Sequence, residues 1–269
     1  AEVRTMLEIK NIYKTFNPGT INEKVALNGL SLKLNEGDFV TVIGGNGAGK
    51  STMLNAVAGV WPVDEGQIII DGTDVTKLSE YKRAAYLGRV FQDPMTGTAA
   101  TMGIEENLAL AKRRGKTRLL RPGITKAERA EYKELLKILN LGLEDRLTSK
   151  VGLLSGGQRQ ALSLLMATLQ KPKLLLLDEH TAALDPKIAA KVLDITDKIV
   201  NRDHLTTLMI THNMKDAIAH GNRLIMMMNG KIVLDIQGEE KKKLTVKQLL
   251  DKFEEASGEE FSNDSAILG

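Results

Sequence analysis

Cysteine is absent from this chain of 269 residues, and so are a large surplus of charge and a long apolar run. The lack of cysteine excludes a disulfide framework, a thiolate-ligated zinc or iron–sulfur cluster and a cysteine nucleophile, and it fits a reducing cytosol. The formal net charge of +3 is too small to indicate a nucleic-acid partner. No apolar run approaches the roughly 20 residues that a membrane-spanning helix needs. The first six residues lack an apolar signal region, so we expect a chain that is not exported.

The remaining composition is that of an ordinary globular protein, and its apolar pattern predicts strands interspersed with helices. Strands are expected at residues 6–11, 25–34, 39–43, 66–71, 87–91, 173–177, 207–210, 223–228 and 231–236. Helices are expected at residues 51–59, 157–169, 186–200 and 244–255, after residue 213, and over most of residues 105–147. The last two strands are joined by Asn229 and Gly230, a dipeptide favoured in two-residue hairpins.

The strongest motif is a glycine-rich loop at residues 44–51, Gly-Gly-Asn-Gly-Ala-Gly-Lys-Ser, between an expected strand and an expected helix. This spacing is that of a phosphate-binding loop, and the alternative is a glycine-rich turn that happens to contain lysine. The glycines let backbone amides turn toward phosphate oxygens, and the helix presents its positive N-terminal end to them. Lys50 is expected to reach the β- and γ-phosphates, and Ser51 to supply an oxygen ligand to Mg²⁺.

Two adjacent carboxylates form the second motif. Residues 174–177 are four leucines, and Asp178 and Glu179 follow at the carboxyl end of the expected strand, where open α/β sheets bind their ligands. Asp178 would hold Mg²⁺ directly or through water, and Glu179 would polarise the water that attacks in line. Such a pair alone is often only a helix cap. Its occurrence together with the loop at Lys50 favours the catalytic interpretation.

The third motif, Leu-Ser-Gly-Gly-Gln at residues 154–158, opens an expected helix with Ser155 as its N-cap. Its two glycines expose backbone amides that form a second anion site. Ser155 lies 105 residues after Lys50. Contact with the same phosphate therefore needs either a chain that folds back or a second subunit.

These motifs resemble those of the ATP-binding subunits of ATP-binding-cassette (ABC) transporters. The glycine-rich loop, the segment at 154–158 and the strand at 174–179 occur in that family's order. Gln92, the loop at 182–185 and His212 do so as well. The resemblance covers nearly the whole chain. Glycine-rich loops of this kind occur in many NTPases, whereas the segment at 154–158 joined to the later histidine is specific to this family.

The resemblance implies an α/β fold of the P-loop NTPase type, with a RecA-like core, an antiparallel β subdomain and a helical subdomain. Residues 1–93 and 166–245 would form the nucleotide-binding core with the antiparallel β subdomain. Residues 94–165 would form the helical subdomain. Residues 246–269 would form a short C-terminal helix and tail, and the polar end from Ser257 onward is expected to fray.

The resemblance also implies a role for several residues. Gln92 would contact Mg²⁺ and the attacking water and couple the site to the membrane subunit. His212 would hydrogen-bond the γ-phosphate and orient Glu179. Phe16 stands where the family stacks an aromatic ring on adenine; Tyr13 is a competing choice, and an ordinary packed phenylalanine is the alternative. Ser155, Gly156 and Gly157 of the third motif would contact the γ-phosphate of the opposite subunit.

Matching this sequence to the family's motifs gives the full set of expected site residues. The expected catalytic residues are Glu179, His212 and Gln92. The expected nucleotide-binding residues are Phe16, Gly44, Asn46, Gly47, Ala48, Gly49, Lys50, Ser51, Thr52, Ser155, Gly156, Gly157, Gln158 and Asp185. The expected metal ligands are Ser51, Gln92 and Asp178. ATP and Mg²⁺ are therefore the expected cofactors.

Two positions depart from the family's pattern. His180 follows Glu179 where most members have proline; it is titratable and near the expected site, and the alternative is a tolerated loop substitution. Ala182 stands where many members have serine, which removes one hydroxyl. The basic insert at residues 112–123 is interpreted either as a solvated loop or as a contact with anionic lipid or an acidic partner.

The resemblance implies a homodimer that sandwiches two ATP molecules head to tail and drives transport through separate permease subunits. A separate permease is the arrangement of bacterial importers, which predicts uptake with the help of an extracytoplasmic substrate-binding protein. Residues 112–123 and 178–181 are similar to a bacterial group whose suggested cargoes include aromatic amino acids, which makes an amino acid the expected cargo. The chain would lie at the cytoplasmic face of the membrane as a peripheral subunit, without a nucleic-acid partner. The alternative is a soluble cassette ATPase that acts in cofactor or complex assembly.

Overall fold

The computed structural model describes residues 3–116 and 123–257. Within these ranges the chain forms two compact units. The first contains residues 3–87, 173–179 and 204–257, and the second contains residues 88–172 and 180–203. The domain boundaries expected from the sequence stay predictions.

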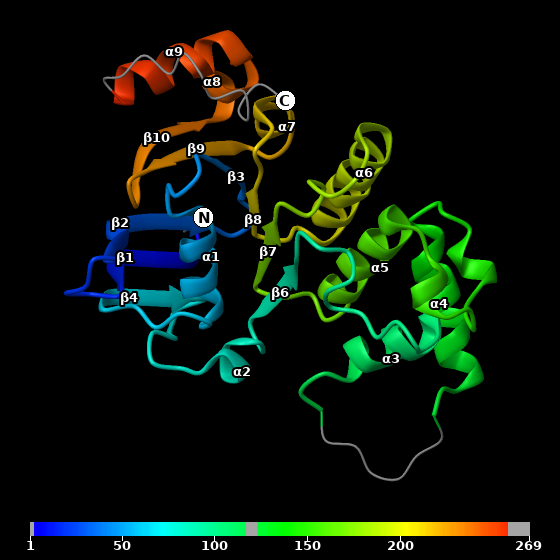
Figure 1. The fold of residues 1–269 in the computed structure, drawn as a ribbon. Helices are drawn as coiled ribbons and strands as arrows, with labels where there is room; N and C mark the ends of the chain where they lie inside the picture. The colour runs from blue at the N-terminus through cyan, green and yellow to red at the C-terminus, as the bar shows by residue number, and fades with distance from the viewer. Residues whose placement is uncertain (1–2, 117–122, 258–269) are drawn as a thin grey trace. The chain divides into compact units, whose positions relative to one another are not determined.

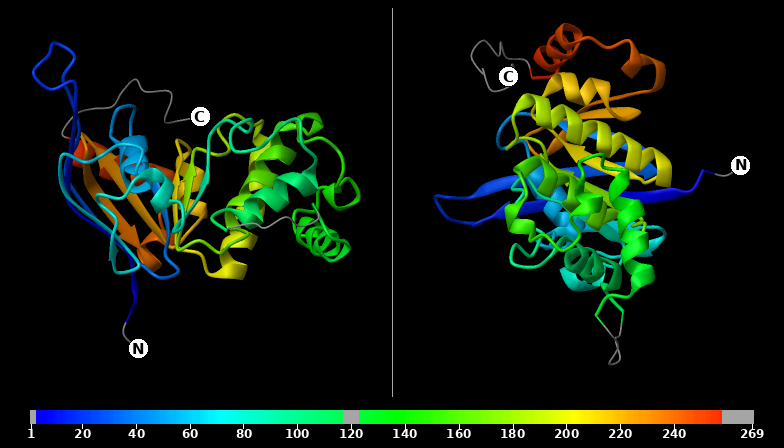
Figure 2. Two further views of the ribbon diagram at one scale, coloured as in Figure 1. Left: turned by 90° about the horizontal axis from the view of Figure 1, so that it is seen from below. Right: turned by 90° about the vertical axis from the view of Figure 1, so that its right-hand side faces the viewer.

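An antiparallel sheet in the first unit has the strand order β2-β1-β4-β5 (Figure 1). Its strands are β1 (Thr5–Phe16), β2 (Lys24–Asn35), β4 (Glu65–Ile70) and β5 (Thr73–Asp74). Figure 2 shows the blue hairpin of β1 and β2 extending beyond the rest of this sheet. One face of the sheet is apolar and contributes to the main core of the unit, which also includes residues of β3 and α1.

The first strand is longer than the sequence predicted. We expected a strand that ends at Asn11, but β1 continues to Phe16. Asn11 has a φ of 45°, and the pairing of β1 with β2 shifts register between Ile9 and Ile12. The polar residues here therefore mark a bulge inside the strand and not its end.

Five strands of a second, six-stranded sheet lie in the first unit, in the order β10-β9-β3-β8-β7. These strands are β3 (Phe39–Ile43), β7 (Leu174–Asp178), β8 (Thr207–Ile210), β9 (Arg223–Met228) and β10 (Lys231–Gln237). β3 and β7 are both parallel to β8. All residues of β3 and the four leucines of β7 are buried, as is typical of parallel strands covered on both faces. The carboxyl ends of these three strands meet at one edge of the sheet.

The hairpin predicted at Asn229 and Gly230 is confirmed between β9 and β10. Both residues have positive φ, 49° and 72°, which is the backbone that a two-residue turn of this handedness requires. The expected bounds of β8 and β9 agree with the structure. The strand β6 (Leu87–Val90) begins at Leu87, which is the last residue of the first segment of this unit, residues 3–87.

The helices of the first unit are α1 (Lys50–Ala58), α2 (Glu80–Arg83), α7 (Met214–Ala219), α8 (Gly238–Lys242) and α9 (Val246–Ser257). The sequence did not predict α2 and α8, which are too short to show an apolar period. Each is fixed by one buried cation instead. The Arg83 guanidinium donates to four backbone carbonyls, and the Lys241 ammonium donates to three. Such tertiary contacts cannot be deduced from a local pattern.

The second unit is helical, as predicted for most of residues 105–147. It contains α3 (Ile104–Arg113), α4 (Lys126–Lys137), α5 (Gly156–Thr168) and α6 (Pro186–Asp203), with the short helices η1 (Leu143–Asp145) and η2 (Val151–Leu153). Arg129 of α4 binds Glu105 of α3 through two hydrogen bonds of 2.7 and 3.0 Å. The central part of the basic insert, residues 117–122, lies outside the described residues, so neither interpretation of that insert is tested.

No helix in residues 3–116 and 123–257 is both long and apolar enough to cross a bilayer. The C-terminal helix expected at residues 244–255 is present as α9, shifted by two residues. Leu249 and Phe253 of α9 are buried in an apolar cluster with Met214 of α7 and Met226 of β9. The frayed end expected from Ser257 onward falls mainly on residues 258–269, which lie outside the described residues.

Candidate functional site

The glycine-rich loop connects β3 to α1, as the sequence predicted. Gly44 and Gly49 are required there for two separate reasons. Both have positive φ, 152° and 100°, and a Cβ on either residue would lie within about 2.5 Å of a backbone oxygen. The oxygen facing Gly49 belongs to Ala26 of β2, and the oxygen facing Gly44 belongs to Met227 of β9. The loop is therefore pressed against both sheets of the unit.

Lys50 is the first residue of α1, and only 5% of its surface is exposed. Its ammonium donates hydrogen bonds of 2.5 and 3.1 Å to the carbonyls of Gly44 and Gly45. Burial lowers the pKa of Lys50, and the carboxylates of Glu179 and Asp178 oppose that shift. A cation held in this way by weak neutral acceptors is ready to exchange them for an anion.

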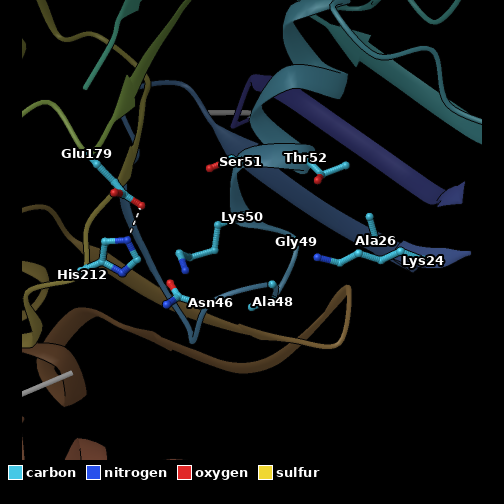
Figure 3. A pocket seen from close by; sticks show the side chains of 11 residues that line it. Lys24, Ala26, Asn46, Ala48, Gly49, Lys50, Ser51, Thr52, Glu179 and His212 are labelled. Atoms are coloured by element: carbon cyan, nitrogen blue, oxygen red, sulfur yellow. Dashed lines mark ion pairs between the residues drawn. The ribbon is translucent and has the colours of Figure 1, made fainter. Parts of the chain in front are cut away.

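The loop and the ends of the parallel strands line one pocket of about 150 Å³ (Figure 3). Figure 3 shows the side chains of Glu179 and His212 on one side of the pocket and the start of α1 on the other. The lining residues are Lys24, Ala26, Asn46, Gly47, Ala48, Gly49, Lys50, Ser51, Thr52, Glu179 and His212. The structure thus brings together nine residues that the sequence analysis expected at the site. Gly44 lies at the start of the loop, outside this lining.

Sequence reasoning missed two lining residues, Lys24 and Ala26 of β2. The Lys24 ammonium lies 3.4 Å from the position that a Cβ on Gly47 would occupy. It brings a second cation to the loop. No motif marks Lys24, because its place depends on the packing of β2 beside a loop that comes 20 residues later in the chain.

Glu179 and His212 form an ion pair or a hydrogen bond, depending on the protonation of the histidine. His212 Nε2 lies 2.6 Å from Glu179 Oε1, and the glutamate side chain is 11% exposed. The Glu179 backbone has a φ of 49°, and its amide donates to the carbonyl of Ile210 at the end of β8. This left-handed conformation is uncommon for a residue other than glycine and carries strain. The backbone contact fixes where the carboxylate can point.

Two of the three expected Mg²⁺ ligands, Asp178 and Ser51, belong to the same unit as the pocket. Asp178 is the last residue of β7, and Ser51 is exposed in the first turn of α1. One carboxylate and one hydroxyl, together with phosphate oxygens and water, make up the ligand set that Mg²⁺ prefers. The described residues contain no cluster of three or more His, Asp or Glu side chains that could hold a metal ion. A site of this kind therefore fits Mg²⁺ held jointly with a phosphate ligand.

The other expected site residues lie in the second unit. Ser155 is the N-cap of α5, as predicted: its hydroxyl accepts from the Gln158 amide, and the Gln158 side chain accepts from the Ser155 amide. Gly156 is exposed, and Gly157 is packed so closely against Ile188 of α6 that a Cβ would lie 2.2 Å from its Cγ2. These observations explain why glycine is needed at position 157.

Gln92 and Asp185 are both exposed in the second unit. Gln92 follows β6, and Asp185 accepts a hydrogen bond of 3.1 Å from the Ile188 amide at the start of α6. Asp185 therefore caps a helix in this structure. The roles that the family resemblance implies for Gln92 and Asp185 stay predictions.

His180 is buried, with 1% of its surface exposed. Its Nε2 lies 3.0 Å from the hydroxyl of Thr196 on α6. That hydroxyl donates to the carbonyl of Val192, so it accepts from His180, and the Nε2 atom carries the proton. The histidine ring therefore serves as an internal anchor.

The aromatic residues near β1 have different partners. Phe16 contacts Trp61 edge to face, with ring centroids 5.3 Å apart. Tyr13 instead lies over Gly29, where its hydroxyl would be 2.8 Å from an added Cβ. Neither aromatic lines the pocket beside the glycine-rich loop. The choice between them as the adenine-stacking residue stays open in the structure.

We expect ATP to change the fluorescence of Trp61, the only tryptophan of the chain, because its ring contacts Phe16. If adenine stacks on Phe16, the Phe16→Leu variant loses this change and its Kd for ATP rises about tenfold, whereas Tyr13→Leu behaves like the unmodified chain. Titration with ATP, followed by tryptophan emission and calorimetry, measures both quantities. The reverse pattern, with the loss in Tyr13→Leu, would assign the stacking to Tyr13.

Comparisons with known proteins agree with this geometry. The family model described as "ABC transporter" matches residues 27–182. The chain is 49% identical to a tyrosine transport ATP-binding protein of Clostridioides difficile, over 93% of this chain and 100% of that protein. It is 34% identical to the spermidine/putrescine import ATP-binding protein PotA of Haemophilus ducreyi, over 87% of this chain and 58% of that protein.

Solved structures of the same kind share the fold. The dimeric cassette MJ0796 bound to ADP and phosphate is 30% identical, with a TM-score of 0.72 over 86% of this chain and 98% of that one. The ADP conformation of MJ1267 is 27% identical, with a TM-score of 0.75 over 95% of this chain and 99% of that one. These likenesses confirm the predicted α/β fold of the ABC ATPase type. The chain belongs to the ABC transporter family, as an ATP-binding subunit with ATPase activity.

Proposed function

We propose that this chain hydrolyses ATP to drive the uptake of tyrosine, or a closely related amino acid, through separate permease subunits. The observation that carries the proposal is the similarity to the tyrosine transport ATP-binding protein, which extends over the full length of that relative. The polyamine transport relative is matched over 58% of its length and at lower identity. The cargo of the full-length relative is therefore the better guide to the cargo of this chain.

The pocket supports a specific division of work among its residues. On phosphate binding, the Lys50 ammonium exchanges the carbonyls of Gly44 and Gly45 for oxygens of the β- and γ-phosphates. The Glu179 carboxylate orients and polarises the attacking water, and His212 holds that carboxylate in place and contacts the γ-phosphate. Ser51 and Asp178 would hold Mg²⁺, which when bound neutralises charge on the phosphate oxygens.

We also propose that the active form is a dimer in which Ser155 and the following glycines complete the partner's site. One of the similar solved structures is dimeric and bound to ADP and phosphate, which supports this assembly. The subunit would sit at the cytoplasmic face of the membrane, attached to the permease. A substrate-binding protein on the other side would deliver the amino acid.

The proposal is tested by affinity purification of a tagged Glu179→Gln variant with ATP from detergent-solubilised membranes of the native cell. We expect a multi-spanning permease to co-purify and to be identified by mass spectrometry. The matched bait is the Lys50→Ala variant, which cannot hold the ATP-bound state and should recover less permease. The purified complex of unmodified subunits is then placed in liposomes, with the binding protein outside and ATP inside.

Uptake of labelled tyrosine that needs ATP supports the proposal, with methionine and spermidine as comparison cargoes. ATP-dependent uptake of another cargo, without tyrosine uptake, would overturn the cargo assignment and leave the transport role intact. Reproducible recovery of soluble partners alone would instead favour the assembly-factor alternative.

A further inference from the structure

A buried glutamine in the second unit connects two of the loops that carry candidate catalytic residues. Gln160 lies on α5, five residues after Ser155, and none of its surface is exposed. Its side-chain nitrogen donates hydrogen bonds of 2.7 Å to the Phe91 carbonyl and 2.5 Å to the His180 carbonyl. Phe91 immediately precedes Gln92, and His180 immediately follows Glu179.

The two acceptor carbonyls lie just beyond the ends of strands. β6 ends at Val90 and β7 ends at Asp178. A carbonyl that has left a sheet and is shielded from water needs another donor, because an unpaired buried acceptor is unfavourable. A carboxamide has two N–H groups, so a single Gln160 side chain satisfies both carbonyls and fixes the distance between them.

The oxygen of the same carboxamide makes no hydrogen bond to the part of the chain that the structure describes. Among the described residues, Gln160 Oε1 has no hydrogen-bond partner although it is buried. A polar atom in that state is unfavourable, and its presence in a core calls for an explanation. A leucine or methionine would fill the space without that cost. What distinguishes glutamine here is the double donation from its nitrogen.

His180 is held both by its backbone carbonyl and by its imidazole ring. Its carbonyl accepts from Gln160 on α5, and its ring donates to Thr196 on α6. The residue after Glu179 thus has little freedom to move relative to either helix. Since a shift of about 1 Å in a reacting group can lower a rate by about a hundredfold, such anchoring has kinetic consequences.

We propose that Gln160 is a positioning residue for ATP hydrolysis, which holds in place the backbone of Phe91 and His180, the chain neighbours of Gln92 and Glu179. The inference rests on the proposed function, in which those two side chains act on the attacking water. Gln160 is fully buried and is not among the residues that line the pocket beside the glycine-rich loop. Its loss therefore lowers kcat and leaves nucleotide binding at Lys50 unchanged.

The test uses the purified full chain in three variants, with ATPase kinetics, calorimetric titration of ATP and thermal unfolding measured for each. Gln160→Met keeps the size of the side chain and removes both donors; we expect kcat to fall at least tenfold while the Kd for ATP changes less than twofold. Ser163→Ala is the matched control, because Ser163 is buried on the same helix and its hydroxyl has no partner among the described residues. We expect Ser163→Ala to keep the unmodified kcat.

Gln160→Glu supplies a readout that a merely structural role would not give. The ionised carboxylate has no donor, whereas the protonated acid donates to one carbonyl, and burial raises the pKa of a carboxyl group. Its kcat relative to the unmodified chain therefore rises as pH falls from 8.5 to 6.5, while the ratio for Gln160→Met stays constant. If Gln160→Met does not fold, this pH profile carries the test alone.

Two results would overturn the inference: an unmodified kcat in both Gln160 variants, or an equal loss of kcat in Ser163→Ala. The failure of the proposed function looks different. In that case the unmodified chain itself would show no ATP turnover, or would recover no permease from membranes, whatever residue stands at position 160.

Discussion

Replacing Glu179 with glutamine is expected to reduce ATP turnover by about a thousandfold, the middle of the range for removal of a general base. The carboxamide cannot take a proton from water, yet it has nearly the same size and can still accept a hydrogen bond from His212 Nε2. Binding of ATP at Lys50 and the loop amides should persist. The ATP-bound dimer then accumulates because hydrolysis no longer opens it.

Three measurements on Glu179→Gln separate these effects: phosphate release for turnover, calorimetry for the Kd of ATP, and light scattering for the mass of the assembly with ATP present. Glu65→Gln is the control, because Glu65 is exposed on β4 and is not part of the pocket. Unchanged phosphate release in Glu179→Gln would contradict the role assigned to Glu179. A normal Kd with a normal mass would contradict only the trapping of the dimer.

Elements with a complete local pattern were predicted from the sequence. The residues of β8 are all buried, as are four of the six in β9, and the predicted bounds of both strands agree with the structure. The start of β1 was predicted, but its continuation past Asn11 was not. An asparagine with positive φ, such as Asn11, occurs inside a bulge as well as at the end of a strand, so the residue type alone does not separate the two cases. Only the pairing with β2, a separate segment of the chain, distinguishes the two.

The same distinction applies to the site. The loop at Lys50 and the pair at Asp178 were predicted because each motif lies within one short segment. The contact between Glu179 and His212, which the family resemblance implied, joins the ends of two parallel strands. Lys24 and Gln160 were missed, since neither residue belongs to a motif and each reaches its partners through packing between elements.

Replacing Lys50 should weaken nucleotide binding itself, which separates its role from that of Glu179. Lys50→Ala and the longer Lys50→Met are both expected to raise the Kd for ATP about a hundredfold, because charge-assisted hydrogen bonds to phosphate contribute roughly 1.5–3 kcal/mol. Titration calorimetry measures this change directly. A Kd within twofold of the unmodified value in both variants would contradict the contact between Lys50 and the phosphates.

The stability of the nucleotide-free chain shows whether Lys50 serves binding or folding. Burial lowers the pKa of Lys50, which means that the folded chain favours the charged ammonium less than the unfolded chain does. Lys50→Met removes that cost together with two hydrogen bonds to the carbonyls of Gly44 and Gly45. These changes oppose each other, so we expect the Tm without nucleotide to move by no more than about 3 °C. With ATP present, the unmodified chain gains stability by RT ln(1 + [ATP]/Kd), and Lys50→Met gains less at the same ATP concentration because its Kd is higher. A large loss of Tm without nucleotide would instead make Lys50 a structural residue of the loop.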